Sequence, residues 1–558
     1  MVPFCYSLFA APVPAIYGRR YENPASRPRI HAGSVAGADP DLPPDPAMTA
    51  PEPPGVVQPL VPMAGTDDVG LVVGDVERGT PVATEAGVVP AGDDVPAGHK
   101  VAVRAVAAGA AVRKYGEVIG LARQDIPAGA HVHTHNLGVG SHTLGTAPTR
   151  TSAATPWRPP AEPTRDRFQG YRRADGRAAT RNYIAVLPTV NCSATVARMV
   201  AQTAAAAHAG TPGLDGVIAL THDLGCGMAE GTAGDDILRR TLRGYAGHAN
   251  IAAVLTISLG CEVNLPENLF GAEVPAETLE IQHLGGTAAT VNAALERVAE
   301  MAAKVSALRR EPIPVSELVL GLQCGGSDAY SGLTANPTLG VAADLLVAAG
   351  GKVILGETPE IYGAEHLLRD RAVSPEVGRR VDELIAWWQD YTARNGAELD
   401  SNPSKGNKAG GITTIWEKSL GAVLKGGTSP LTDVVAYAEA VTAAGLTFMD
   451  TPGYDPVSAT GMVAGGATLL AFTTGRGSVF GSRPTPCLKI STTSRLYEHM
   501  RGDMDFDAGP AMSRQDQVRY GVRLFEALID MASGAPSKSE ALGFGTEEIV
   551  PWRMGAVV

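Results

Sequence analysis

The sequence predicts an α/β protein in which a small β domain precedes parallel-sheet α/β domains. Beyond about residue 168, apolar runs alternate with alanine-rich helical stretches, as in NYIAVLPTV at 182–190 followed by a helix from about residue 193. Near-continuous apolar strands separated by helices are typical of parallel sheets covered on both faces. Between Asp67 and about Val139, short alternating runs are separated by VPAG and IPAG turns, which indicates a small domain with many short strands.

Composition divides the chain into five predicted segments. Residues 1–65 are rich in Pro, Ala and Gly without periodicity, which predicts a disordered leader. The small β domain is expected at 66–145, and a linker with five prolines at 146–167. A first α/β domain is expected at 168–311 and a C-terminal α/β domain, beginning at an EPIP break, at 312–558.

Length and charge limit the partners. At 558 residues, of which 44% are hydrophobic, the chain can bury several cores. The net charge of −12 comes from scattered acidic residues and no Lys/Arg-rich run is present, so we expect neither nucleic acid nor a membrane as a partner. No apolar stretch is long enough to span a bilayer. Together with a proline-punctuated start that lacks a basic n-region, this predicts a cytoplasmic protein. The six cysteines are too few and too widely spaced for a disulfide framework, which predicts free thiols.

Four cysteines follow predicted strands directly. They are Cys192 after VLPTVN, Cys226 after IALTHDLG, Cys261 after LTISLG and Cys324 after LVLGLQ. Open parallel sheets bind ligands at the carboxyl ends of their strands, so four thiols in this context favour a site over simple burial as small hydrophobes. The four thiols either lie together at the carboxyl edge of one sheet or are divided between two sheets. With Glu262, His222 and Asp328 nearby, they are candidates to hold iron, as one ion or as a cluster.

The motifs GHK and HVHTHN supply a second group of candidate residues. These residues are His99, Lys100, His131, His133, His135 and Asn136. On a strand, alternate histidines of the second motif share one face. This pattern indicates either a metal or carboxylate site near a domain interface or a solvated polar edge.

Glycine-rich motifs with cations and hydroxyls form a third group. Their polar members are Lys405, Asn407, Lys408, Glu417, Lys418, Ser458, Thr460, Arg476 and Ser478. Glycine lets backbone amides approach a ligand, and Lys with Ser or Thr suits a polyhydroxy carboxylate, although such loops also occur on ordinary surfaces. The absence of GxxxxGK[ST], of GxGxxG after a strand and of GxSxG argues against kinases, NAD enzymes and serine hydrolases.

Several long stretches resemble the altronate/galactarate dehydratase family. They are GYRRADGRAATRNYIAVLPTVNCSA at 170–194, LGCE at 259–262, CGGSDAYSGLTANPTLG at 324–340, GETPEIYGAE at 356–365, NPSKGNKAGGITTIWEKSLG at 402–421, FMDTPGYDPVSATGM at 448–462 and FTTGRGSVFGS at 472–482. DVPAGHK, KYGEVIG and DIPAGAHVHTHN are similar to the small β-clip domain, of the SAF type, that precedes the catalytic domains in that family. The resemblance is collinear over about residues 67–515.

The resemblance implies a hydro-lyase that converts a sugar acid such as altronate or galactarate to a 2-keto-3-deoxy acid. It implies ferrous iron, Fe(2+), as the usual metal. Mn(2+) and an iron–sulfur cluster are the alternative cofactors, the cluster because of the cysteines described above. The expected partner is the small-molecule sugar acid, and a homodimer is left open beside a monomer. A related C–S lyase acting on sulfolactate and a non-catalytic sugar-acid-binding protein are the alternative functions.

Positions carried over from the family motifs, together with the residue groups described above, give the expected site; the loop around Cys226 departs from the family pattern. The expected catalytic residues are His99, Lys100, His133, His135, Lys405 and Lys408. The expected substrate contacts are Asn136, Ser327, Asp328, Asn336, Asn407, Ser458, Thr460 and Arg476. The expected metal ligands are Cys192, Cys226, Cys261, Glu262 and Cys324. Dehydration needs a base for the C2 proton and cationic stabilisation of the aci-carboxylate that forms, and this set supplies both.

Overall fold

A computed structural model of the chain describes residues 57, 65–85, 87–140, 156–263, 266–270 and 277–554. The predicted leader therefore lies almost wholly outside the described residues, and so does the first half of the predicted linker. Residues 55–558 group into one unit that contains every element named below.

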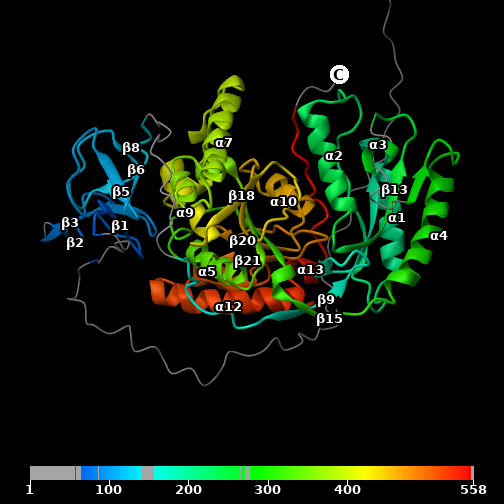
Figure 1. The fold of residues 1–558 in the computed structure, drawn as a ribbon. Helices are drawn as coiled ribbons and strands as arrows, with labels where there is room; N and C mark the ends of the chain where they lie inside the picture. The colour runs from blue at the N-terminus through cyan, green and yellow to red at the C-terminus, as the bar shows by residue number, and fades with distance from the viewer. Residues whose placement is uncertain are drawn as a thin grey trace, which may run out of the picture. The chain divides into compact units, whose positions relative to one another are not determined.

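Short antiparallel strands build the small domain (Figure 1). They are β1 (Val69–Leu71), β2 (Pro81–Thr84), β3 (Gly87–Pro90), β4 (Lys100–Ala102), β5 (Ala111–Lys114), β6 (Glu117–Ala122), β7 (His131–Val132) and β8 (Leu137–Gly138). The strand orders are β1-β4-β7, β2-β3 and β5-β6-β8. Apolar side chains such as those of Val69, Ile119 and Val132 are fully buried between them. The predicted N-terminal β domain is confirmed.

A small antiparallel sheet lies where the chain enters and leaves the first α/β domain. Its strands are β9 (Arg167–Arg172), β10 (Ala178–Ala179) and β15 (Glu311–Pro314), in the order β10-β9-β15. Strand β9 precedes that domain and β15 follows it. The segment that enters the domain and the segment that leaves it are therefore hydrogen-bonded to each other as antiparallel strands.

The first α/β domain is a four-stranded parallel sheet with helices on both faces. Its elements are β11 (Tyr183–Pro188), α1 (Asn191–Ala207), β12 (Gly216–Ala219), α2 (Ala233–Ala246), β13 (Ile251–Ser258), α3 (Pro266–Phe270), β14 (Glu277–Glu280) and α4 (Thr287–Val305), and the strand order is β12-β11-β13-β14. Every residue of β11 is buried. Ile184 and Val186 pack against α1 and α4, whereas Ala185 and Leu187 share a core with α2, as the alternation of side chains along a strand requires.

The C-terminal domain contains a parallel sheet, as the apolar runs predict, and this sheet has seven strands. Its strands are β16 (Val319–Cys324), β17 (Lys352–Leu355), β18 (Leu431–Val435), β19 (Gly445–Met449), β20 (Leu469–Thr474), β21 (Cys487–Ser491) and β22 (Phe506–Asp507), in the order β18-β19-β17-β16-β20-β21-β22. Strand β16, which ends at Cys324, is the central strand. All its residues are buried, so its end lies among the loops of the neighbouring strands.

Helices cover both faces of this sheet (Figure 1). The helical segments are η1 (Val315–Glu317), α5 (Ala335–Ala348), η2 (Thr358–Ile361), α6 (His366–Arg369), α7 (Pro375–Arg394), η3 (Leu399–Ser401), α8 (Lys405–Ala409), α9 (Ile415–Val423), η4 (Leu424–Gly426), α10 (Asp455–Ala464), α11 (Ser494–His499), α12 (Arg514–Ala532) and α13 (Lys538–Leu542). Helices α5 and α12 pack together in the core of one face, and α10 packs with α2 in the other. None of the described helices is long and apolar enough to cross a membrane.

Three buried charges join the small domain to the C-terminal domain. Glu417 of α9 accepts hydrogen bonds at 2.9 Å from the ammonium groups of Lys100 on β4 and Lys114 on β5, and these side chains are at most 2% exposed. Burial would raise the pKa of Glu417, but the two lysines lower it to about 2. Burial and the neighbouring Lys114 lower the pKa of Lys100 to about 8 in spite of its partner. Glu417 therefore holds two cations that have few other partners.

Replacing Glu417 by Gln should destabilise the protein strongly, because two buried ammonium groups lose their counter-charge. We expect a loss of about 3–5 kcal/mol in the free energy of unfolding, measured by urea denaturation. The control is Glu376→Gln, which breaks an exposed ion pair with Arg379 and should cost less than about 1 kcal/mol. Equal losses for the two variants would contradict this account of the interface.

Candidate active site

Cys324 ends the central strand at a point where the backbone turns tightly. The two glycines that follow it explain the unusual local sequence. A Cβ atom on Gly325 would lie 2.1 Å from Oδ2 of Asp455 and 2.6 Å from the ring of Phe472, so no larger residue fits there. Gly326 has a φ of +61°, in the left-handed region that favours glycine. The turn after β16 is therefore closely packed, and the thiol of Cys324 is buried at the end of the strand.

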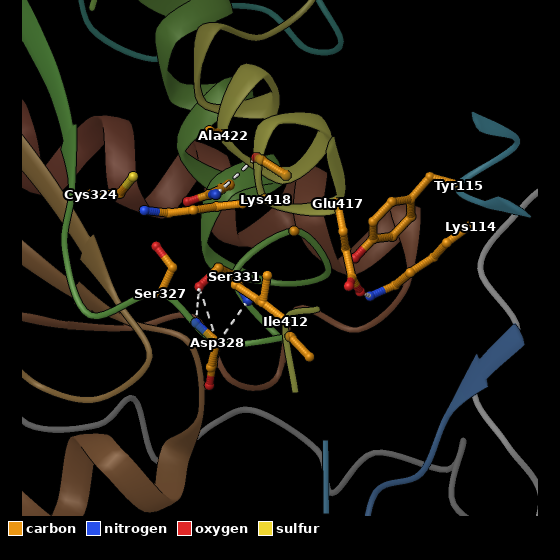
Figure 2. Close-up of a pocket in the computed structure, with 14 residues that line it drawn as sticks. Lys114, Tyr115, Cys324, Ser327, Asp328, Ser331, Ile412, Glu417, Lys418 and Ala422 are labelled. Atoms are coloured by element: carbon orange, nitrogen blue, oxygen red, sulfur yellow. Dashed lines mark hydrogen bonds and ion pairs between the residues drawn. The ribbon is translucent and has the colours of Figure 1, made fainter. Parts of the chain in front are cut away.

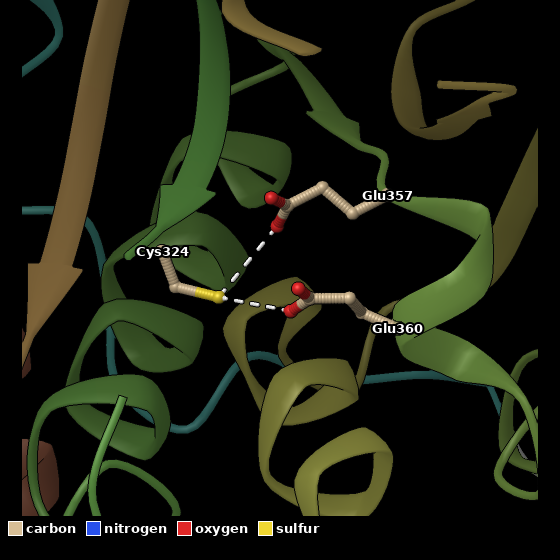
Figure 3. A group of neighbouring side chains, drawn as sticks. All are labelled: Cys324, Glu357 and Glu360. Carbon is tan, nitrogen blue, oxygen red and sulfur yellow. Dashed lines mark hydrogen bonds between the residues drawn. The ribbon is translucent and has the colours of Figure 1, made fainter. Parts of the chain in front are cut away.

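Two carboxylates from the neighbouring strand face this thiol. Strand β17 pairs with β16 and is followed by Glu357, whose φ of +68° is strained for a residue with a side chain, and by Glu360 in η2. Oε2 of each carboxylate lies 3.6 Å from the sulfur of Cys324 (Figure 3). Strain at a left-handed residue is common at functional sites, and here it directs a carboxylate at the thiol.

Two lysines neutralise these acids. The Lys425 ammonium donates to Cys324 Sγ at 2.8 Å and to Glu357 Oε2 at 3.0 Å. The Lys418 ammonium donates to Glu360 Oε1 at 2.6 Å and to Oδ1 of Asn402 at 3.0 Å. The cluster is therefore a buried network of alternating charges and not a set of isolated acids.

Burial is the largest cause of the pKa shifts in this cluster. It raises the pKa of the Cys324 thiol, although Lys425 opposes the change. It also raises the pKa of Glu357, and the carboxylates of Glu360 and Asp455 add to that effect. The pKa of Lys425 is raised despite burial, because the thiol and the two glutamates around it favour its charged form.

The chemistry of these donors fits a divalent metal. Among the described residues, Cys324, Glu357 and Glu360 are the one group of at least three His, Cys, Asp or Glu residues whose ligand atoms all lie within 4.8 Å of one another. Oε1 of Glu357 is buried and has no hydrogen-bond partner in the described part of the chain. One thiolate and two carboxylates are ligands suited to first-row metals such as iron and manganese. The ammonium group of Lys425, which contacts Cys324 and Glu357, would compete with a metal ion for these donors.

A pocket beside the cluster combines both domains (Figure 2). Its lining residues are Lys114, Tyr115, Cys324, Ser327, Asp328, Ala329, Ser331, Gly332, Asn336, Ile412, Glu417, Lys418, Gly421 and Ala422. In Figure 2, Ser327 and Lys418 extend toward the same space as Cys324, and Lys114, Tyr115 and Glu417 stand at the opposite end. The buried ion network between the domains is thus one wall of this pocket.

Three of the predicted substrate contacts line this pocket: Ser327, Asp328 and Asn336. The Asp328 carboxylate accepts hydrogen bonds from the backbone and hydroxyl of Ser331 and from the hydroxyl of Thr492. Burial raises the pKa of Asp328 to about 6, and the hydrogen bonds only partly oppose this rise. The amide of Asn336 is satisfied at both ends, by the Gly421 carbonyl and the Thr473 hydroxyl.

The predicted histidines gather against α8. Nδ1 of His99 lies 3.0 Å from Nε2 of His131, and Nε2 of His133 lies 2.9 Å from the carbonyl of Lys408. The ring of His135 is 5.5 Å from that of His131. Burial lowers the pKa of His131 to about 3 and that of His133 to about 4, with the neighbouring histidines and Lys100 adding to the effect. The GHK and HTHN motifs therefore meet the SKGNK motif, but among the described residues that line the pocket none is a histidine.

Most of the remaining residues that were expected to contact the substrate form hydrogen bonds within the protein. Asn136 bridges the backbone of its own turn, accepting from His133 N and donating to the His131 carbonyl. Asn407 completes the capping box of α8 and donates to the Ser327 carbonyl. Ser458 bonds the hydroxyl of Thr451, and Thr460 bonds the backbone of Glu548 and Val550.

Two expected cations are exposed: Lys405 on α8 and Arg476 after β20. Arg476 lies beside the glycine loop, since a Cβ on Gly326 would be 3.2 Å from its Cβ. Neither residue lines the pocket in the described part of the chain.

The expected metal ligands are divided between two sheets. Cys324 belongs to the pocket, whereas Cys192, Cys226, Cys261 and Glu262 follow strands of the first α/β domain. His222, also considered for iron, uses both ring nitrogens within its loop, one with the Pro188 carbonyl and one with the Leu224 amide. Sequence alone left open whether the thiols meet at one place, and the topology decides this question.

Sequence reasoning missed the two glutamates and Lys425. Glu357 and Glu360 lie in the motif GETPEIYGAE directly after an apolar run, at the same sheet edge as Cys324. A carboxylate that follows a parallel strand is the signal that could have found them. Lys425, in the run LKGG, carries no such pattern, because its approach to Cys324 depends on how α9 and η4 pack.

Family models match three parts of the chain. Residues 315–557 match the C-terminal domain of D-galactarate/altronate dehydratase, and residues 170–306 match the second domain of D-galactarate dehydratase/altronate hydrolase. Residues 58–139 match the altronate/galactarate dehydratase SAF domain. The pocket thus lies between the parts matched by the first and the third model.

Individual relatives are similar over most of their length. Altronate dehydratase of Bacillus subtilis (strain 168) is 35% identical over 479 residues, which cover 84% of this chain and 94% of that protein. Galactarate dehydratase (L-threo-forming) of Escherichia coli (strain K12) is 36% identical over 488 residues, covering 84% and 92%. The (2R)-sulfolactate sulfo-lyase subunit beta of Chromohalobacter salexigens is 34% identical over 382 residues, but these cover 67% of this chain. The dehydratases therefore account for more of the chain.

The lowered pKa values of the histidines predict a stability that depends on pH. When unfolded, these imidazoles regain a pKa of about 6.5 and bind protons that the folded state rejects. Stability should be complete above about pH 6.5 and should fall as the pH drops toward 4. The double variant His131→Asn, His133→Asn should lose less stability over this interval, as measured by urea denaturation at each pH. Thr134→Ala, in the same turn, should keep the dependence of the unchanged protein; a dependence equally steep in the double variant would contradict the assignment.

Proposed function

The chain belongs to the D-galactarate/altronate dehydratase family and is a sugar-acid dehydratase, and we propose that the reaction takes place in the pocket beside Cys324, Glu357 and Glu360. The observation that carries this proposal is that Cys324, one of three buried metal-compatible donors, lines a pocket that also contains a cation and a carboxylate. The pocket lies at the carboxyl end of the central strand, where open α/β sheets bind their ligands.

We propose that Cys324, Glu357 and Glu360 hold a divalent metal, Fe(2+) first and Mn(2+) as the alternative. When bound, such an ion acts as a Lewis acid that stabilises charge on substrate oxygens. Support comes from the mixed thiolate and carboxylate donors and from the unpartnered Oε1 of Glu357. Lys425 keeps negative charge on this cluster favourable until the metal is bound.

Lys418 and Ser327 are the proposed donors to the substrate carboxylate. In the described part of the chain, two of the three N–H groups of Lys418 are taken by Glu360 and Asn402, which leaves one for a ligand. Lys114, at the opposite end of the pocket, is paired with Glu417. One available cation suits an acid with one carboxylate better than an acid with two, so we propose an aldonic acid such as altronate as substrate.

Asp328 is the proposed acceptor of the C2 proton. It lines the pocket, its partners are hydroxyls and backbone amides, and its pKa of about 6 leaves it ionised at neutral pH. A base whose pKa lies near the working pH is an efficient proton acceptor. The histidines expected for this role contact α8, outside the pocket lining.

Iron-loaded protein should convert an aldonic acid to a 2-keto-3-deoxy acid. A panel of aldonic acids, aldaric acids and sulfolactate, assayed anaerobically for keto acid and for sulfite separately, tests this. We expect keto acid without sulfite, and altronate turned over faster than galactarate. Cys324→Ala and Glu357→Gln should each weaken iron binding by on the order of 100-fold and reduce turnover with it.

The matched control for that experiment is Cys487→Ala, which removes a thiol that is equally buried on β21 of the same sheet. It should keep both iron and activity. Full iron content and activity in Cys324→Ala would contradict the metal proposal. Release of sulfite would identify a C–S lyase. Ligand binding without product would identify a binding protein.

Asp328→Asn should lower kcat by roughly 10²–10⁴-fold while iron binding is kept. In the unchanged protein, kcat/KM should fall as the pH drops below about 6, because protonated Asp328 cannot accept a proton. Ser331→Ala, which leaves the carboxylate in place, should lose much less activity. A large loss in His133→Asn together with an active Asp328→Asn variant would assign the base to the histidine cluster instead.

A further inference from the structure

Three thiols outside the pocket come together at one edge of the first α/β sheet. Cys192 is the second residue of α1, directly after β11, and Cys226 and Cys261 follow β12 and β13. These three strands are adjacent and parallel in the order β12-β11-β13. Their carboxyl ends, and the loops that carry the cysteines, therefore lie at the same edge.

Direct contacts join the three loops. The amide of Asn191, beside Cys192, donates to the carbonyl of Leu224 at 3.1 Å. On the other side, the hydroxyl of Thr189 donates to Oε1 of Glu262 at 2.6 Å. The loop after β11 thus contacts both of its neighbours within two or three residues of each cysteine.

Two polar residues hold these loops and are not free to bind a metal. Nε2 of His222 lies 3.0 Å from the Pro188 carbonyl, and its Nδ1 accepts from the Leu224 amide at 3.3 Å. Burial lowers the pKa of His222 to about 4, so the ring stays neutral. Glu262 accepts from Thr189 and from the amides of Leu259 and Gly260. Both side chains fix the position of a cysteine loop.

Two glycines let the loops approach closely. Gly225, with a φ of +103°, precedes Cys226, and a Cβ there would lie 3.0 Å from the carbonyl of Thr189. Gly260, with a φ of +118°, precedes Cys261, and its Cβ would lie 2.6 Å from Oε1 of Glu280. Larger residues at these places would push the cysteine loops away from β11 and its neighbours.

Packing does not account for these thiols. Cys192, Cys226 and Cys261 are exposed, whereas Cys324 and Cys487 are buried. Exposed cysteines contribute little to a core, so three of them at one sheet edge need another explanation. Their sulfurs do not all lie within 4.8 Å of one another, which is too far apart for the three to share one ion in this arrangement.

We propose that Cys192, Cys226 and Cys261 bind an iron–sulfur cluster. In such a cluster each cysteine is bound to a different iron, so the thiolates are spaced more widely than around a single ion. Three thiolates leave one iron of a four-iron cluster without a cysteine ligand. Gln282 supports this assignment, since its amide already lies 3.3 Å from the sulfur of Cys261 with the N–H directed at it, as hydrogen bonds to cluster sulfurs require.

This cluster is separate from the pocket metal. The proposed mononuclear ion uses Cys324 on β16, and the cluster uses three thiols on the other sheet. Acid-labile sulfide distinguishes the two, because only the cluster contains it. Failure of either proposal leaves the other standing.

The experiment is anaerobic reconstitution of the full chain with ferrous iron and sulfide, followed by assays of iron, acid-labile sulfide and visible absorption. We expect about four sulfides per chain. Cys192→Ala, Cys226→Ala and Cys261→Ala should each reduce bound sulfide at least tenfold. Cys487→Ala and Cys324→Ala are the matched controls and should retain it.

Gln282→Leu provides a test that does not remove a ligand. The variant should keep the cluster but lower its reduction potential, because a hydrogen bond to sulfur is lost. Absence of acid-labile sulfide from the reconstituted protein would overturn the proposal. So would sulfide retained in all three cysteine variants, an unchanged potential in Gln282→Leu, or binding of zinc by the three thiols without any cluster.

Discussion

The pocket depends on the pairing of one buried carboxylate with two lysines from another domain. Glu417 lies on α9, and Lys100 and Lys114 reach it from strands of the small β domain. Buried charges are tolerated only when they are paired, so the small domain and α9 must adopt one specific arrangement. That arrangement brings Lys114 and Tyr115 to the pocket and places Lys418, the residue after Glu417, at its other end. The position of the proposed substrate site thus follows from an electrostatic requirement at the domain interface.

Both parallel sheets carry thiols at the carboxyl ends of their strands, but the surroundings of these thiols differ chemically. In the C-terminal sheet, the loop after the central strand is buried by its neighbours, and the thiol at its end is surrounded by carboxylates and ammonium groups. In the first α/β sheet, the corresponding loops are open, and three thiols remain exposed. Burial therefore separates a site suited to one ion and an anionic substrate from a site suited to a larger inorganic group.

The sequence was informative where a pattern is local. The apolar runs predicted β11, β13, β16 and β17, and the alternating runs predicted the small domain. Cys324, which ends one of these runs, and Ser327, Asp328 and Asn336 of the motif that follows line the pocket. Lys425 and Glu417 could not be placed in this way, because their roles depend on contacts across about a hundred residues or more. The separation of Cys324 from the other thiols likewise depends on strand order, which the periodicity of a single strand does not encode.

The covalent connection between the small domain and α9 has a thermodynamic consequence. Lys100 and Lys114 belong to the same chain as their partner Glu417, so forming the pocket is an intramolecular step. Its equilibrium is set by an effective concentration within the molecule and not by the concentration of protein in solution. A molecule whose domains separate can therefore reassemble its pocket by itself, and the fraction of complete pockets stays constant on dilution.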